Sequence, residues 1–293
     1  MELLKLNEVN LTNLDQRFKQ SPIGKLWAVI ILLGFCGMFI TFYFKGEWEL
    51  GAATIATAIC ILIALFTFRM FLKNIGPNAW NLAVAPSVVY IKFRSFFNSH
   101  FPENDPQVVS LPFSEIKSLQ INKQKLKYNI TRNSKGGIKR TGTVTKYQTF
   151  LDITVNGIDL TGLAKQLHYE HTLKCSKSDS NVKSSVRHFP VRIVMPDTIR
   201  VEWFTKNTRL KPGINNAIEV LRQQHISIEE LRNEVLDYTE IASQDIQEIN
   251  KIVFELALRE SKSAAVEVAK KKYDLDYKEA KGFVENLMDE NAA

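Results

Sequence analysis

The chain is poor in cysteine, lacks the common catalytic motifs and has no long hydrophobic run after residue 73. Three of its 293 residues are cysteine, and Cys36 and Cys60 lie inside apolar segments. A disulfide scaffold is therefore not supported. The sequence has no GxSxG nucleophile turn, no glycine loop that would cradle a phosphate and no pair of carboxylates placed for acid–base catalysis. These absences favour a protein that is not an enzyme and needs no cofactor.

Two long hydrophobic runs stand near the start of the chain. Residues 26–44 and 50–68 each comprise 19 residues without a charged side chain. At 1.5 Å per helical residue such a run is about 28 Å long, close to the roughly 30 Å hydrocarbon core of a bilayer. We therefore expect a transmembrane helical hairpin over residues 26–72 rather than a pair of buried core helices. The polar residues before the first run argue against a cleaved signal peptide, and the absence of charge within the runs argues against a channel.

The distribution of basic residues predicts the orientation of this hairpin. The short connection, KGEWE at 45–49, carries one lysine beside two glutamates. The flanks are basic on both sides, at Lys5, Arg17, Lys19, Lys25, Arg69, Lys73, Lys92 and Arg94. Cytoplasmic segments of membrane proteins are enriched in lysine and arginine. We therefore expect an integral protein of the plasma membrane (the inner membrane in a bacterium), with a cytoplasmic N-terminal segment at 1–25 and a cytoplasmic C-terminal region.

Small side chains recur every four residues in the second run. They are Ala52, Ala56, Cys60 and Ala64. In lipid, a stripe of small residues lets helix backbones approach closely. The simplest partner is the first run, which offers Gly34 and Gly37; self-association into a homo-oligomer is the alternative.

Between residues 77 and 226 apolar side chains recur at every second position, which is the period of a half-buried strand. The expected strands cover 87–93, 118–124, 147–155, 187–195 and 198–204. Asn156-Gly157 is typical of a type I′ hairpin turn. Ile214, Ile218 and Leu221 repeat at helical spacing behind Pro212, which predicts an amphipathic helix after the strands. The predicted fold class is thus α+β, with a domain at 77–226.

Two segments of this domain resemble parts of the bacterial pleckstrin-homology-like (PH-like) domains that follow membrane spans. LPFSEIKSLQI (111–121) is similar to their short strand, turn and long strand, and KPGINNAIEVL (211–221) is similar to their capping helix. The resemblance implies an antiparallel sheet or small barrel closed by that helix, with a surface for anionic lipids or proteins. The chain is longer than such domains near 95–107 and 164–185.

Residues 117–151 contain nine lysines and arginines and no acidic residue. Three of the lysines alternate and would line one face of a strand, and four further basic residues lie in an expected flexible loop at 132–142. Each basic side chain near an anionic leaflet contributes ~1 kcal/mol of attraction, so this segment is a candidate lipid-binding surface; a solvated basic face is the alternative. It shows no nucleic-acid motif, so a nucleic-acid partner is not expected. The candidate residues are Lys123, Lys125, Lys127, Arg132, Lys135, Lys139 and Arg140.

His168, His171 and Cys175 form the one cluster with metal-ligand spacing. On a helix these side chains would lie near one face, and imidazole with thiolate suits zinc. A fourth ligand is missing nearby, so His188 would have to supply it. The same three residues are also explained as exposed side chains in a loop insertion. A zinc-dependent enzyme is therefore the weaker hypothesis.

After residue 226 the pattern becomes helical, and residues 227–289 predict a small bundle. Ser227 and Glu230 suggest a capping box for a first helix at 231–242. Further helices are expected at 244–260, 263–273 and 276–288, the last behind a box of Asp276 and Glu279.

The sequence of residues 257–287 is similar to the helical part of the C-terminal domain of the large-subunit ribosomal stalk protein and to small UBA-like modules. The resemblance implies a protein-binding face on this bundle, and a solvated lysine-rich face is the alternative. The residues of that face are Lys270, Lys271, Lys278 and Lys281.

Two hypotheses of function follow from these patterns. A membrane-anchored adaptor would contact anionic headgroups through its basic segment and a protein partner through its tail. Alternatively, the chain is an accessory or regulatory subunit of a larger membrane complex that assembles through the transmembrane hairpin.

Overall fold

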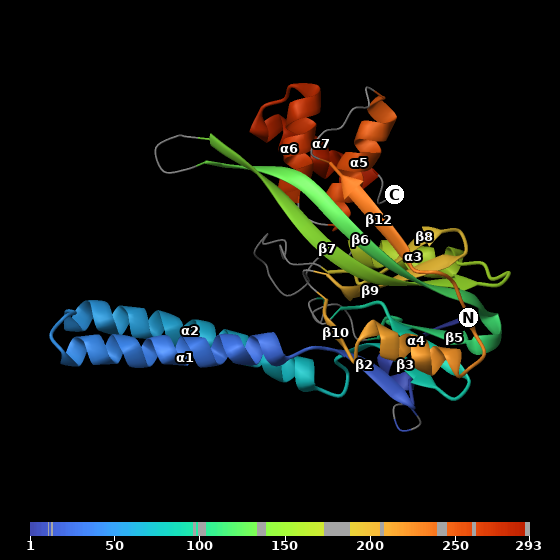
Figure 1. Cartoon of the computed structure of the whole chain (residues 1–293), viewed down its shortest axis with the longest axis horizontal. Helices are drawn as coiled ribbons and strands as arrows, with labels where there is room; N and C mark the ends of the chain where they lie inside the picture. Colours follow the sequence, from blue (N-terminus) through green and yellow to red (C-terminus); the bar gives the residue numbers. More distant parts are fainter. Residues whose placement is uncertain are drawn as a thin grey trace. The chain divides into compact units, whose positions relative to one another are not determined.

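The computed structural model of this chain divides into two compact units, each assembled from segments distant in sequence (Figure 1). Unit 1 comprises residues 1–117, 175–191 and 207–227, and unit 2 comprises 118–174, 192–206 and 228–293. The structure describes residues 1–290 except 11, 13, 96–97, 99–103, 134–138, 173–187, 206–207, 239–244 and 260–261. The predicted α+β class is confirmed. Unit 2 draws on segments from both sides of the predicted boundary at 226.

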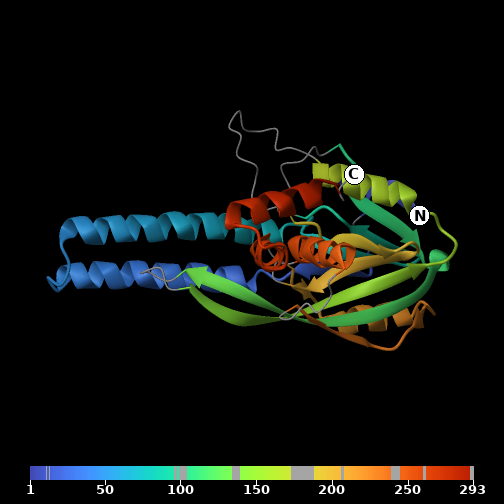
Figure 2. The same ribbon diagram turned by 90° about the horizontal axis from the view of Figure 1, so that it is seen from above.

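Helices α1 (Ile23–Phe44) and α2 (Leu50–Ile75) form a hairpin in unit 1. They lie side by side in both views (Figures 1 and 2). Each helix is long and apolar enough to cross a membrane. The chain reverses between them within five residues, where Gly46 takes a left-handed conformation (φ +72°) that strains residues bearing a Cβ.

Both ends of this helix pair continue into one sheet. β2 (Gln16–Gln20) ends two residues before α1 and pairs antiparallel with β3 (Trp80–Ala85), which begins four residues after α2. The sheet has the order β1-β5-β4-β3-β2-β10, with β1 at Glu2–Leu4, β4 at Val88–Lys92, β5 at Val108–Pro112 and β10 at Leu210–Lys211. The N-terminal segment is therefore folded into unit 1 rather than preceding it.

The core of unit 1 follows from the apolar side chains of these strands. Phe18, Leu82 and Ile91 are fully buried. The predicted amphipathic helix is present as α4 (Ile214–Arg222), which buries Ala217, Ile218 and Leu221 on one side. Burying such a side chain fully contributes roughly 1.5–3 kcal/mol, so these side chains are a main source of the stability of this unit.

Unit 2 is built on the long strands β6 (Ile116–Asn133) and β7 (Lys139–Val155). At about 3.3 Å per residue each strand is roughly 55–60 Å long. The sheet has the order β11-β6-β7-β9-β8, and β12 (Arg232–Asp237) also pairs with β6. The remaining strands are β8 (Val191–Met195), β9 (Thr198–Phe204) and β11 (Ser227–Ile228). The predicted loop at 132–142 is thus largely strand, and only 134–138 lies outside the described residues.

The segment LPFSEIKSLQI runs from β5 of the first sheet, through the 3-10 turn Phe113–Glu115, into β6 of the second. The two stretches that carry the resemblance to PH-like domains therefore contribute to two sheets. The PH-like fold stays a prediction.

The hairpin predicted at Asn156-Gly157 is wrong. A turn is present, with Gly157 at φ +65°, but the chain then enters α3 (Thr161–Thr172) and β7 pairs with β9 instead. The Asp159 carboxylate accepts hydrogen bonds from the backbone N–H of Thr161 (2.8 Å) and from its hydroxyl (2.5 Å). These local bonds favour a helix start over a second strand.

The helix predicted at 231–242 behind Ser227 and Glu230 is also wrong. Residues 232–237 form β12, parallel to β6. The Glu229 backbone N–H donates to Leu119 O (2.8 Å), and the Ser118 hydroxyl donates to the Glu229 carboxylate. The neighbouring strand therefore satisfies the backbone of this segment, which outweighs the local signal for a capped helix.

The C-terminal residues form the helices α5 (Ile246–Arg259), α6 (Lys262–Tyr273) and α7 (Tyr277–Glu290). The predicted capping box is confirmed: Glu279 N–H donates to Asp276 Oδ1 (2.8 Å) and Asp276 N–H donates to Glu279 Oε2 (2.9 Å). The helices share one apolar core, made by Ile249, Val253, Leu256, Ala265, Val266, Ala269, Ala280, Val284 and Leu287.

Candidate functional site

The helix pair exposes a large apolar surface. Only 6% of the most apolar window of each helix is buried within the protein, and Phe44, Leu62 and Phe66 are 67–80% exposed. Removing apolar surface from water is worth about 25 cal/mol per Å², so this surface favours a lipid environment. A core helix of a soluble domain would be mostly buried, which neither α1 nor α2 is.

The contact between α1 and α2 is made by small side chains. Ala53 and Ala64 of α2 are buried, as is Cys36 of α1, whose Sγ lies 3.9 Å from Thr57 O. A helix face repeats every 3.6 residues, so a strict spacing of four drifts away from it. For this reason Ala53, rather than the predicted Ala52, lies on the covered side.

The other members of the predicted stripe, Ala56 and Cys60, are half-buried. Gly34 and Gly37, the expected contacts on α1, are exposed instead, and no atom lies within 4 Å of the position that an added Cβ would take. The closest approach of α1 to α2 therefore does not use the glycines. They leave a shallow strip on the outer side of α1.

A buried lysine lies next to the end of α2. Lys92 on β4 donates a hydrogen bond from Nζ to Asn78 O (2.5 Å), three residues beyond the helix. Burial, with a smaller contribution from the charge of Arg94, lowers the pKa of Lys92 to about 8. Arg94 itself pairs with Asp105 (3.4 Å). The stability of unit 1 therefore depends on pH in the mildly alkaline range.

Lys123, Lys125 and Lys127 lie on one face of β6, as their alternation predicted. The residues between them, Gln124 and Leu126, are buried on the opposite face. Lys125 Nζ lies 5.8 Å above the ring of Tyr147 on β7, and Tyr147 is 64% exposed. This face thus combines the exposed Lys123 and the half-buried Lys125 and Lys127 with an aromatic ring, a combination typical of membrane interfaces.

β12 brings negative charge to the end of this basic face. Asp237 stands directly opposite Lys127 in the parallel register, and its carboxylate lies 3.2 Å from Lys127 Nζ. The segment 117–151 has no acid of its own, but the fold supplies one at Lys127. Lys123 and Lys125 are therefore the better candidates for contact with an external anion.

The remaining predicted basic residues lie near the tip of the β6–β7 pair. Arg132, Lys139 and Arg140 belong to the strands, and Lys135 lies outside the described residues. In the C-terminal bundle, Lys271, Lys278 and Lys281 are exposed, whereas Lys270 is half-buried in the last turn of α6.

The predicted metal ligands are divided between the two units. His168 and His171 lie on α3 of unit 2, whereas His188 belongs to unit 1. There His188 is buried, with Nδ1 3.1 Å from Ser95 Oγ and Nε2 3.2 Å from Thr208 Oγ1. Cys175 lies outside the described residues. Within the described part of the chain no three His, Cys, Asp or Glu side chains gather as metal ligands.

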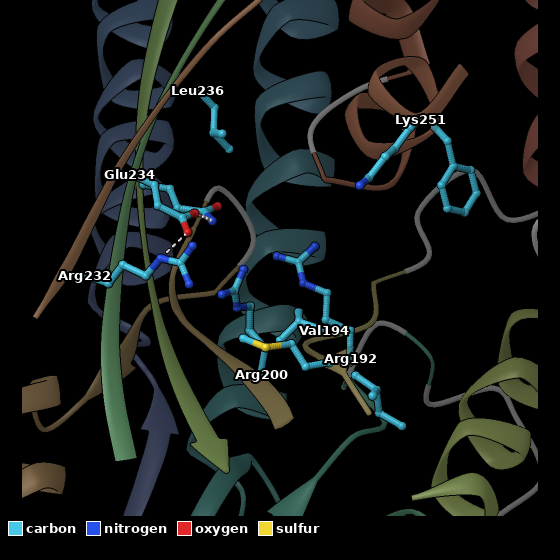
Figure 3. A pocket seen from close by; sticks show the side chains of 11 residues that line it. Arg192, Val194, Arg200, Arg232, Glu234, Leu236 and Lys251 are labelled. Carbon is cyan, nitrogen blue, oxygen red and sulfur yellow. Dashed lines mark hydrogen bonds and ion pairs between the residues drawn. The ribbon is translucent and has the colours of Figure 1, made fainter. Parts of the chain in front are cut away.

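A buried ion pair in unit 2 was not foreseen from the sequence. Asp152 of β7 and Arg200 of β9 stand opposite each other in the antiparallel register. Both carboxylate oxygens accept, at 2.6 Å, from Arg200 Nε and Nη2. Arg200 also lines a cavity of about 580 Å³ in unit 2 (Figure 3). Asp152 is the single charge in LDITV, and Arg200 is the single basic residue in TIRVEWF, whose other charge is Glu202. A charge at the centre of a mostly apolar strand is the signal that could have paired them.

Comparison with known proteins finds no matching family model, no matching curated protein and no matching solved structure.

Proposed function

We propose that this chain is a non-enzymatic membrane-anchored adaptor, in which α1 and α2 cross the membrane as a hairpin and the rest of the chain works on the cytoplasmic side. The pairing of β2 with β3 carries this proposal. The connections of two and four residues between these strands and the helices reach at most about 7–14 Å. A membrane-inserted hairpin would therefore hold this sheet at the headgroups, with both helix ends on one side.

The basic flanks of the hairpin support a cytoplasmic position for that side. Lys19 lies on β2 and Lys25 in the first turn of α1, whereas the reverse turn carries Glu47 and Glu49 beside its one lysine. Positive charge accumulates on the cytoplasmic ends of membrane helices. The same cations would meet the anionic inner leaflet.

The orientation can be tested by labelling single cysteines with a membrane-impermeant maleimide. The variants Glu2→Cys, Glu47→Cys and Tyr277→Cys are compared in a Cys175→Ser background in intact cells that express the full chain. We expect labelling of Glu47→Cys in intact cells, and of the other two after permeabilisation alone. Labelling of Glu47→Cys and Tyr277→Cys from the same side, or recovery of the chain in the soluble fraction, would overturn the proposal.

The adaptor hypothesis further requires that Lys123 and Lys125 contact anionic headgroups. Each would contribute ~1 kcal/mol, and Lys127 less because Asp237 opposes it. The full chain is placed in nanodiscs of phosphatidylcholine with or without phosphatidylglycerol, and hydrogen exchange of β6 and β7 is measured. We expect the anionic lipid to slow exchange in the wild type but not in Lys123→Gln/Lys125→Gln. The matched control is Lys271→Gln/Lys278→Gln. Equal slowing in all three proteins would contradict the lipid contact.

A second candidate function is that of an accessory subunit in a larger membrane complex. The observation that favours it is the strip at Gly34 and Gly37, which α2 leaves uncovered and which would let another helix approach closely. Gly34→Leu/Gly37→Leu should then lose a co-purifying membrane partner that the control Ala58→Leu, also on an exposed helix face, retains. Retention of the same partner by the glycine variant excludes assembly through this strip.

A further inference from the structure

Two cysteines lie at the contact between α1 and α2. Cys36 of α1 is buried and Cys60 of α2 is half-buried, and both are free thiols in this structure. A hydrogen bond joins the two thiols. Cys36 Sγ also lies 3.9 Å from Thr57 O, one helical turn before Cys60. The fold thus places side by side two cysteines that belong to different helices.

The position of Cys60 follows from the side of α2 that packs on α1. Ala53 and Ala64 of that side are buried. Cys60 comes seven residues after Ala53 and four before Ala64, and this spacing keeps side chains on one face of a helix. Cys60 therefore faces α1 together with the two alanines, and the contact between the thiols is a consequence of how the helices pack.

The spacing of packed helices suits a disulfide. Their axes lie about 8–10 Å apart, and each Cα atom lies about 2.3 Å from its axis. Cα atoms that face each other across such a contact are therefore about 3.5–5.5 Å apart, which overlaps the range of about 4.4–6.8 Å found in disulfides. Small side chains, here Ala53 and Ala64, allow this close approach. A bond between Cys36 and Cys60 thus needs no large movement of either helix.

Both thiols lie near the middle of the apolar helices. Cys36 is eight residues from the end of its apolar segment at Phe44, and Cys60 is nine residues from the start of its own at Gly51. At 1.5 Å per residue these separations are about 12 Å and about 14 Å, close to half of the roughly 30 Å hydrocarbon core. In a membrane-inserted hairpin the pair would lie at the centre of the bilayer, which apolar reagents enter and charged ones do not.

We propose that Cys36 and Cys60 form a redox site, at which an organic hydroperoxide dissolved in the lipid joins α1 to α2 through a disulfide. Such peroxides form on unsaturated lipid chains and therefore share the surroundings of the pair. Cys60 is the more exposed thiol, and oxidation follows exposure, so Cys60 is attacked first and Cys36 resolves the product. The lipid route rests on the membrane insertion proposed above, whereas the pairing of the thiols does not.

The reaction has two steps. Cys60 loses its thiol proton, and its sulfur attacks the outer oxygen of the hydroperoxide. The O–O bond breaks, Cys60 becomes a sulfenic acid, and the peroxide takes up the proton and leaves as the alcohol. The sulfur of Cys36 then attacks the sulfur of the sulfenic acid, the S–O bond breaks, and water leaves with the proton of Cys36. The two thiols are thereby oxidised to one disulfide, and one peroxide is reduced to alcohol and water.

The test uses the full chain with Cys175→Ser, one chain per nanodisc of saturated phosphatidylcholine, treated with cumene hydroperoxide or with hydrogen peroxide. Free thiols are counted by maleimide labelling after denaturation, and the intact mass is measured. We expect cumene hydroperoxide to remove both free thiols with a mass loss of two hydrogens, which dithiothreitol reverses. Hydrogen peroxide should act more slowly because it stays mainly in water.

Two variants in the same background assign the roles of the sulfurs. Cys36→Ser should stop at the sulfenic acid of Cys60, which dimedone traps. Cys60→Ala/Leu62→Cys is the matched control, because two residues turn the thiol by about 200° around α2, to a position that is 67% exposed. Its sulfenic acid should form without a disulfide to Cys36. Circular dichroism checks that both variants keep their helices.

Three outcomes overturn the proposal. If Cys36 and Cys60 serve only as small packing residues, both thiols stay reduced while the exposed thiol of the matched control is oxidised. A disulfide that forms equally well in the matched control would show that the contact between the helices does not select the pair. Equal rates with the two peroxides would contradict the lipid route and the membrane insertion, but not the contact of the thiols.

Discussion

The ion pair between Asp152 and Arg200 gives the sharpest prediction about unit 2. The side chains are only 4% and 6% exposed, and two parallel hydrogen bonds of 2.6 Å join them. Asp152→Asn keeps the size and one oxygen of the side chain but removes its charge. The guanidinium then remains buried without its counter-charge, which costs about 3–5 kcal/mol in comparable buried pairs.

The size of this effect depends on whether the remaining residue is charged. Replacing both partners by apolar residues, as in Asp152→Leu/Arg200→Met, removes both desolvation penalties and is expected to be near neutral or stabilising. Phe150, two residues before Asp152 on the same face, is fully buried with its ring centre 5.2 Å from Arg200 Cζ, so an apolar pair fits this environment. The single variant should therefore be less stable than the double variant.

Native-state hydrogen exchange in nanodiscs measures the effect where it occurs, because two units need not unfold together. For Asp152→Asn, a loss of 3–5 kcal/mol corresponds to opening of β7 and β9 that is roughly 10² to 4 × 10³ times more frequent. Glu219→Gln, an exposed acid on α4, is the control. Exchange of β7 and β9 that changes less than about threefold (under 1 kcal/mol), or a double variant weaker than the single one, would refute a desolvated pair.

Two further predictions concern Lys92 and the cap of α7. The pKa of Lys92 is about 8 in the folded chain and near 10.4 when unfolded, so between these values the unfolded state binds the extra proton. Stability relative to Lys92→Met should then be constant below pH 8 and rise by about 3 kcal/mol toward pH 10, measured by thermal unfolding in nanodiscs; parallel pH profiles would contradict it. Asp276→Ala removes the acceptor of the Glu279 N–H bond and should cost about 1 kcal/mol, seen as roughly fivefold faster exchange in the first turn of α7 and not in α5.

Local sequence patterns correctly predicted the elements whose hydrogen bonds and apolar contacts are made mostly within the element or with its neighbours in sequence. The helix pair follows from two uninterrupted apolar runs, and α4 and the three C-terminal helices follow from helical patterns. The cap at Asp276 follows from two residues three apart. The alternation in β6 correctly separated Lys123 and Lys125 from the buried residues between them.

The wrong and missing predictions share one cause. Each concerns a segment whose structure depends on a partner distant in sequence. Residues 231–237 carry a helical signal, but β6 offers them a parallel edge. The short segment at 16–20 becomes a strand because β3, more than sixty residues later, lies beside it. The acid at Lys127 and the Asp152–Arg200 pair likewise arise from strand register, which a single sequence without paired positions does not specify.

The two faces of β6 differ in composition, and this makes the lipid contact separable from the fold of the sheet. Lys123 and Lys125 point to one side of β6, and Gln124 and Leu126 are buried on the other. Because side chains alternate strictly along a strand, Lys123→Gln/Lys125→Gln should abolish the effect of anionic lipid on exchange and leave the exchange of β6 in phosphatidylcholine alone unchanged. A variant that also exchanges faster in phosphatidylcholine alone would indicate that the sheet itself is disrupted, and the lipid contact could then not be assigned from it.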